Sequence, residues 1–123
     1  MHTHSYETTS GEIHAHDVSD LWAHTAALPV EHLPLEVAVR TFNGYINTFD
    51  SDDWDRVIEA DLSYPIIFND TYGVVDGCHR CVKAMLLGEI HIAVKRMATY
   101  PAPKRIFSGW EEYLLDHIEG TGK

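Results

Sequence analysis

Five consecutive residues, Asp76-Gly77-Cys78-His79-Arg80, bring a carboxylate, a thiol, an imidazole and a guanidinium to one short elbow. The apolar pair before them predicts a strand, and the helical spacing of the apolar residues after them predicts a helix over 78–87. The start of a helix carries unpaired backbone N–H groups and the positive end of the dipole, so it favours an anion. Because His79 and Arg80 also suit phosphate oxygens, the elbow predicts a phosphate-binding site.

Three further positions at or near the elbow each allow two interpretations. Asp76 ends the predicted strand, where it can position Mg²⁺ or polarise a substrate hydroxyl, or else serve as a turn or helix-capping residue. Gly77 permits a positive φ or the close approach of a phosphate to the backbone. Lys83 follows Arg80 by about one helical turn and can face either the phosphates or the solvent.

The two cysteines, Cys78 and Cys81, form a C-x-x-C pair across the first turn of the same helix. Such a pair can be redox-active or can bind a metal, and a thiol at a helix start gains reactivity. No further pair of ligands stands at a spacing typical of zinc sites. We therefore favour the interpretation that Cys81 is a small core residue and that Cys78 alone faces the site.

Composition limits the function classes. The formal charge of −10 disfavours non-specific DNA or RNA binding, which depends on Lys and Arg. The basic residues gather between Arg80 and Arg105, and this local excess suits a small anionic ligand. Because we find neither a transmembrane run nor a signal peptide, we expect no membrane association and a cytoplasmic location.

The 123 residues predict one domain over 17–123, preceded by a flexible, His-containing tail over 1–16. The pairs His2/His4 and His14/His16 can chelate a metal on an extended strand, or can be incidental in a solvated tail. Sequence patterns predict helices over 17–27, 51–61, 78–87 and 108–118, helical spacing over 39–49, and strands over 66–68, 74–75 and 90–94. They also predict extended chain over 28–35, a turn over 69–73 and a loop over 97–107.

A resemblance to a known family rests on residues 64–97. Gly77-Cys78-His79-Arg80 after an apolar strand resembles the sulfiredoxin signature. The wider pattern, with Pro65 leading a strand, then Val-Val-Asp-Gly-x-His-Arg, then a helix ending in Leu-Leu-Gly, is similar to the ParB/sulfiredoxin-like superfamily and its free-serine kinases. The resemblance implies an α/β (α+β) fold with a small mixed sheet flanked by helices. It also implies that His79 and Arg80 hold the phosphates of ATP or ADP.

Three functions follow as hypotheses. The first is Mg²⁺-dependent phosphoryl transfer from ATP or ADP to a small hydroxyl acceptor, or hydrolysis, with Asp76 or Glu36 as the base. The resemblance to the serine kinases is what implies Glu36 in this role, with Glu31 as the alternative. The second, implied by the resemblance, is a sulfiredoxin-like ATP-dependent reduction of cysteine sulfinic acid with Cys78 as the nucleophile. The third is a non-enzymatic module that binds a protein or nucleic-acid partner. The base of the nucleotide, the acceptor and the oligomeric state stay open.

Overall fold

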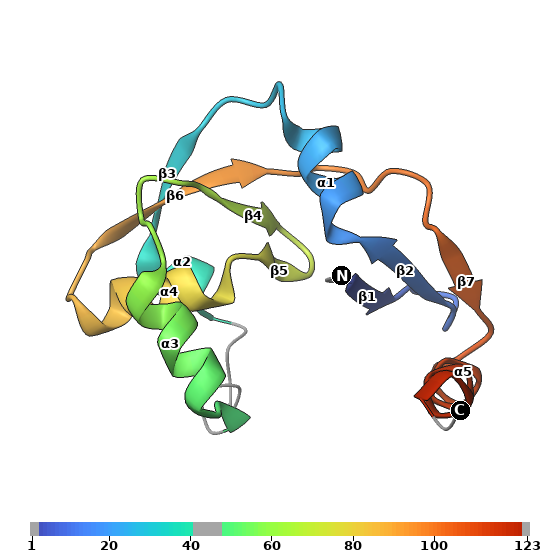
Figure 1. The fold of residues 1–123 in the computed structure, drawn as a ribbon. Helices are drawn as coiled ribbons and strands as arrows, with labels where there is room; N and C mark the ends of the chain where they lie inside the picture. The colour runs from blue at the N-terminus through green and yellow to red at the C-terminus, as the bar shows by residue number, and fades with distance from the viewer. Residues whose placement is uncertain (1–2, 41–47, 122–123) are drawn as a thin grey trace. The chain divides into compact units, whose positions relative to one another are not determined.

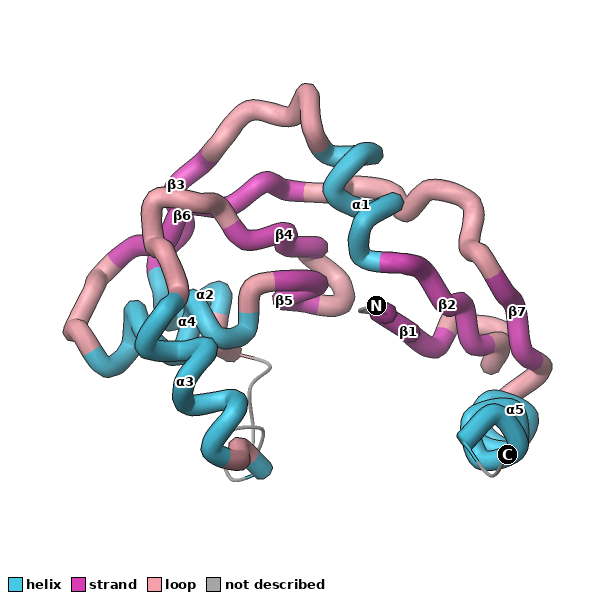
Figure 2. Tube along the Cα trace, viewed as in Figure 1, coloured by secondary structure: helices cyan, strands magenta, loops and turns pink. Residues whose placement is uncertain are grey.

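The computed structural model describes residues 3–40 and 48–121, without the side chains of 119–121. The chain has a mixed α+β fold, as expected, with seven strands in two sheets and five helices among these residues (Figures 1 and 2). It divides into two compact units, which we call the terminal unit (residues 1–24 and 100–123) and the central unit (residues 25–99). The single domain expected over 17–123 stays a prediction.

The central unit contains a four-stranded mixed sheet with the strand order β3-β6-β4-β5. Its strands are β3 (Glu31–Pro34), β4 (Ile66–Asn69), β5 (Gly73–Asp76) and β6 (His91–Arg96). The pairs β3–β6 and β4–β5 are antiparallel, whereas β4 and β6 are parallel. The parallel pair requires a crossover, which α4 (Cys78–Leu86) provides after β5.

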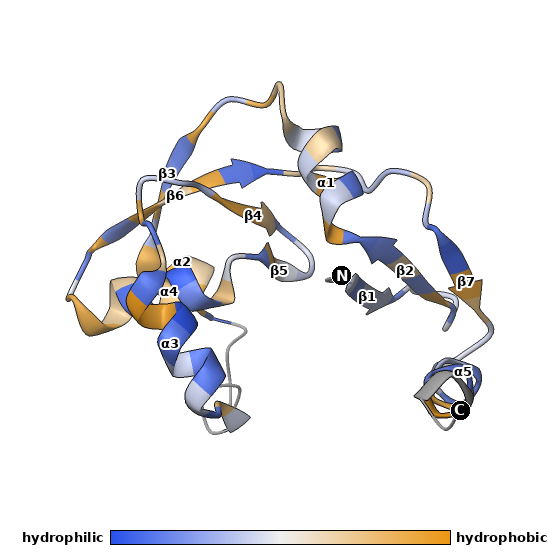
Figure 3. Cartoon of the chain, viewed as in Figure 1, coloured by the Kyte–Doolittle hydropathy of each residue, from blue (hydrophilic) through white to orange (hydrophobic). Residues whose placement is uncertain are grey.

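Alternating apolar side chains place the core of the central unit on one face of this sheet. Ile66 and Phe68 of β4 and Ile92 and Val94 of β6 pack against residues of α2 (Leu35–Ala38) and α4. Figure 3 shows the hydrophobic colour on β4, β6 and α4. The core therefore fixes the position of α4 relative to β4, and with it the elbow between β5 and α4.

The terminal unit contains an antiparallel three-stranded sheet with the order β1-β2-β7. Its elements are β1 (Thr3–Glu7), β2 (Ile13–Asp17), β7 (Arg105–Phe107), α5 (Trp110–Thr121) and most of α1 (Val18–Thr25). The flexible tail expected over residues 1–16 is thus a β-hairpin over the described residues 3–17. Gly11, with φ 91°, closes its turn, and Ile13 is fully buried.

One face of the hairpin is a cluster of stacked rings. His4 pairs with His16 across the strands, and Tyr6 pairs with His14. The Tyr6 ring lies 5.8 Å from His16 and 4.2 Å from Tyr100, centroid to centroid. The alternating histidines therefore lie in a cluster of stacked rings, in which His16 is buried.

Most predicted elements are confirmed within a few residues. The clearest case is α3 (Ser51–Glu59), which begins and ends close to the predicted range 51–61. Two differences stand out. The predicted loop over 97–107 contains β7, whose pairing with β2 is invisible to local patterns. The helical spacing over 39–49 is not matched by α2, which ends at Ala38, and residues 41–47 lie outside the described chain.

Candidate functional site

The elbow turns on a glycine that no other residue can replace without strain. Gly77 has φ 112°, in the left-handed region, at the junction of β5 and α4. A Cβ at this position would lie 2.8 Å from Ile66 Cβ and closer still to Ile66 Cγ2. Ile66 is a fully buried residue of β4 that cannot move aside easily. The glycine therefore lets the first turn of α4 pack directly against the sheet.

The first turn of α4 has no side-chain cap. The N-cap residue is Gly77, which makes no side-chain cap hydrogen bond, and an intrahelical bond runs from Cys81 N–H to Gly77 O at 3.0 Å. The helix itself offers no acceptor to the N–H groups before Cys81. Since the nine-residue helix also places its positive dipole end here, the elbow favours an anionic ligand.

His79 is held by a carboxylate from the neighbouring helix. Its Nε2 lies 3.0 Å from Asp53 Oδ1, and its ring lies 5.4 Å from that of Phe49. The hydrogen bond from His79 is the main reason that the pKa of Asp53 is lowered, with the backbone bond to Asp50 second. This contact fixes the imidazole but also brings a negative charge close to the predicted phosphate site.

The side chain of Lys83 contacts the C-terminal end of α3, whereas His79 contacts its N-terminal end. Lys83 Nζ donates to Ile58 O at 2.8 Å and to Ala60 O at 2.6 Å, at the C-terminus of α3. His79 and Lys83, four residues apart on α4, thus contact the two ends of α3. This geometry gives Lys83 a role in holding α3, besides the phosphate contact that the sequence predicted.

The remaining predicted residues lie on three elements of the central unit. Arg80 is half-buried in the first turn of α4, near enough to Asp61 to help lower the pKa of that carboxyl, an effect due mainly to Ser63. Asp76 is half-buried at the end of β5, where it pairs with Ile67 of β4. Glu36 is exposed in the first turn of α2, which packs against α4.

The two thiols differ as the sequence interpretation expected. Cys81 is fully buried in the core, and this burial raises its pKa to about 12, with Cys78 adding a smaller effect. Cys78 is half-buried at the start of α4. Both are free cysteines. Any thiol chemistry at the elbow therefore belongs to Cys78.

Metal coordination at the elbow is not preformed. Within residues 3–40 and 48–121, no three His, Cys, Asp or Glu side chains are grouped to hold an ion. Magnesium commonly binds through one or two carboxylates together with substrate phosphates, and Asp76 is a carboxylate next to the elbow.

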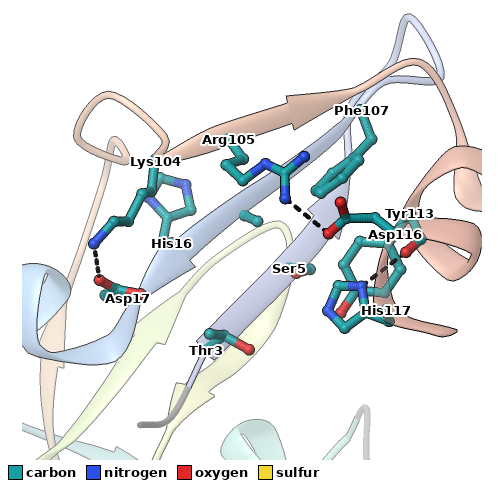
Figure 4. A pocket seen from close by; sticks show the side chains of 11 residues that line it. Thr3, Ser5, His16, Asp17, Lys104, Arg105, Phe107, Tyr113, Asp116 and His117 are labelled. Carbon is teal, nitrogen blue, oxygen red and sulfur yellow. Dashed lines mark hydrogen bonds and ion pairs between the residues drawn. The ribbon is translucent and has the colours of Figure 1, made fainter. Parts of the chain in front are cut away.

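Sequence reasoning missed a second site, a small pocket in the terminal unit between the β1-β2-β7 sheet and α5 (Figure 4). Its charged residues are Asp17, Lys104, Arg105 and Asp116. The concentration of basic residues up to Arg105 was a signal, but it was assigned to the elbow. The acidic partner of Lys104 is Asp17 of the N-terminal hairpin, which was predicted to be a tail, and the partner of Arg105 is Asp116 of α5.

No family model, curated protein or solved structure matches this chain. The resemblance to the ParB/sulfiredoxin-like superfamily accordingly stays a prediction, and the fold class established here is α+β. Among the described helices, none combines the length and the apolar character needed to cross a membrane.

Proposed function

We propose that the elbow binds the phosphates of a nucleotide such as ATP or ADP. The observation that carries this proposal is the start of α4, where Gly77 replaces a capping side chain and brings the helix against β4. Backbone N–H groups at such a position are the usual partners of phosphate oxygens. Arg80 adds a guanidinium in the same turn, which suits a bidentate contact to phosphate.

The residues around the elbow support phosphoryl transfer to a small hydroxyl acceptor, or hydrolysis. When bound, Mg²⁺ would neutralise charge that develops on the phosphates, and Asp76 would help to hold it. Asp76 or Glu36 would take the proton of the attacking hydroxyl as its oxygen bonds to the terminal phosphorus and the bond to the leaving diphosphate breaks. His79, fixed by Asp53, would donate to a phosphate oxygen through an oriented ring. The proposal includes a cytoplasmic location.

The test is a thermal-shift panel of ATP, ADP, CTP and GTP with and without Mg²⁺. A ligand at 100 times its Kd stabilises the folded state by about 2.7 kcal/mol, which raises Tm by several degrees in a domain of this size. We expect Arg80→Ala to abolish the shift. The matched control is Arg56→Ala, which removes an exposed arginine in the last turn of α3 and should keep the shift. If no nucleotide shifts Tm, the elbow is not a nucleotide site and a partner-binding module becomes the better hypothesis.

A second candidate is the sulfiredoxin-like reduction of a cysteine sulfinic acid. The contrast between half-buried Cys78 and buried Cys81 favours it, because only Cys78 is placed to act as a nucleophile. In this reaction ATP first phosphorylates the sulfinic oxygen, and the Cys78 thiolate then displaces phosphate to form a thiosulfinate, which an external thiol reduces. Cys78→Ser would abolish this activity. It would affect phosphoryl transfer to a hydroxyl only mildly, so measuring both activities separates the two candidates.

A further inference from the structure

The pocket of the terminal unit is small, with a volume of about 140 Å³, and charged side chains lie along its lining. Besides Thr3, Ser5, Ala15 and Asp17 from the hairpin, β7 and α5 contribute Arg105, Phe107, Tyr113, Asp116 and His117. The volume is well below the roughly 300–1,000 Å³ of pockets for drug-sized ligands, so it admits only a few heavy atoms.

Strand alternation places most of the hairpin residues of the pocket on the face opposite the stacked rings, although His16 of that ring cluster also lines the pocket. Residues 3, 5, 15 and 17 point to one face of the sheet, and His4, Tyr6, His14 and His16 point to the other. Helix α5 covers the first face, since the Tyr113 ring packs on Phe107 at 5.3 Å between centroids. The pocket is thus bounded by hydroxyl and carboxylate groups of the hairpin on one side and by α5 on the other (Figure 4).

Two ion pairs line the pocket. Lys104 Nζ lies 2.6 Å from Asp17 Oδ2, and Arg105 Nη1 lies 2.7 Å from Asp116 Oδ2 (Figure 4). The side chain of Asp17 is only 12% exposed, and its hydrogen bond is the main reason that the pKa of Lys104 is raised. The described bonds use Oδ2 of each carboxylate, which leaves Oδ1 able to accept from a ligand.

Uncharged donors lie between these pairs. Across the described part of the chain, the hydroxyls of Thr3, Ser5 and Tyr113 have no hydrogen-bond partner, although all three residues line the cavity. Polar groups that converge on a cavity without partners are typical of a ligand site, because a ligand or water must satisfy them.

The balance of charge selects the ligand. A simple anion that approaches Lys104 or Arg105 is repelled by the carboxylate that lies within 3 Å of each of these cations. A simple cation that approaches Asp17 or Asp116 is repelled in the same way by the neighbouring Lys104 or Arg105. A ligand with both charges avoids each repulsion, since its carboxylate faces the cations and its ammonium faces the acids. We infer that this pocket binds a small zwitterion with one carboxylate and one ammonium group, a function separate from phosphate binding at the elbow.

The test is a titration of the full ¹⁵N-labelled chain with zwitterions of increasing charge separation: glycine, β-alanine and 4-aminobutyrate. Propionate and propylammonium serve as singly charged controls. We expect at least one zwitterion to perturb amide signals of β1, β2, β7 and α5, with both controls binding at least about tenfold more weakly. Equal binding of either control, or no zwitterion binding below about 10 mM, overturns the inference.

Variants locate the site. Asp116→Asn should weaken zwitterion binding about tenfold or more, because the amide cannot pair with an ammonium. The matched control is Glu111→Gln, an acid-to-amide change at an exposed position of the same helix that does not line the pocket, and it should leave affinity unchanged. If both variants bind like the wild type, the zwitterion binds elsewhere and the assignment fails. If Asp116→Asn does not fold, Lys104→Met provides the same test, because Lys104 is largely exposed.

Discussion

Helices α3 and α4 pack against each other but begin in opposite ways. At α3, Asp50 Oδ1 accepts from Asp53 N–H at 2.9 Å, and Asp53 Oδ2 accepts from Asp50 N–H at 3.1 Å, a complete capping box. At α4, a left-handed glycine stands at the same position without a side-chain cap. The start of α3 is capped by its own side chains, whereas the N-cap residue of α4 provides no side-chain acceptor.

The two helices also differ in how they are held: α4 packs into the core, and side chains of α4 in turn hold α3. Helix α4 contributes Cys81 and Ala84 to the core, while α3 buries Val57 alone in full. His79 and Lys83 of α4 then contact both ends of α3. Helix α4 is therefore both the helix that is anchored in the core and the helix that begins with a glycine N-cap. A rigid position of this kind suits a binding site.

The largest expected loss of stability comes from replacing the glycine at the start of α4. Gly77→Ala should lower the free energy of unfolding by roughly 2–5 kcal/mol, because it adds left-handed strain and an overlap with Ile66. Urea unfolding measures the change. The matched control is Gly88→Ala, at φ 71° with nothing within 4 Å of the added Cβ, which should cost only the strain of roughly 1–2 kcal/mol. Equal losses for both variants would show that contact with Ile66 does not define the elbow.

A smaller loss of stability is expected from removing the side-chain cap of α3. Asp50→Ala removes the side-chain acceptor of the α3 capping box and should cost about 1 kcal/mol in the free energy of unfolding. Asp52→Ala, also in the first turn but outside the capping box, should cost about 0.3 kcal/mol through the helix dipole. Urea denaturation of both variants tests the ranking, and a larger loss for Asp52→Ala would contradict it.

The smallest expected effect is on how the stability of the folded state depends on acidic pH. Because His79 lowers the pKa of Asp53 below its ordinary value of 3.8, the ionised carboxylate stabilises the folded state above that pH. This stability should be lost as pH falls through the lowered folded-state pKa. His79→Gln should reduce the loss between about pH 5 and pH 2, as measured by urea denaturation at several pH values. An unchanged acid dependence would mean that the His79–Asp53 contact does not stabilise the folded state.

Local patterns predicted the central unit well, because its signals lie within short segments. Asp50 and Asp53 mark the start of α3, and the run Ile66-Ile67-Phe68 marks a buried strand. At the site, the glycine elbow and the split between Cys78 and Cys81 were predicted correctly. The bond from His79 to Asp53 was not, since it joins residues 26 positions apart and depends on how α3 packs on α4.

The terminal unit was harder to predict, because its strands depend on distant pairing. In isolation, residues 3–7 are polar and residues 105–107 are only three in number, and both become strands through their pairing with β2. The alternation of His14 and His16 was read as metal chelation or chance, although the same alternation predicts a strand with one buried face. The pocket followed from that pairing and could not be seen without it.

The assembly of the terminal unit from both ends of the chain sets an order of events during synthesis. The central unit is continuous, so it can fold as soon as residues 25–99 have left the ribosome. Strand β2 must wait for β7, and closing so long a loop is entropically costly and slow when the intervening chain is unfolded. A folded central unit shortens the effective loop, so the pocket of the terminal unit is expected to form after the central unit has folded.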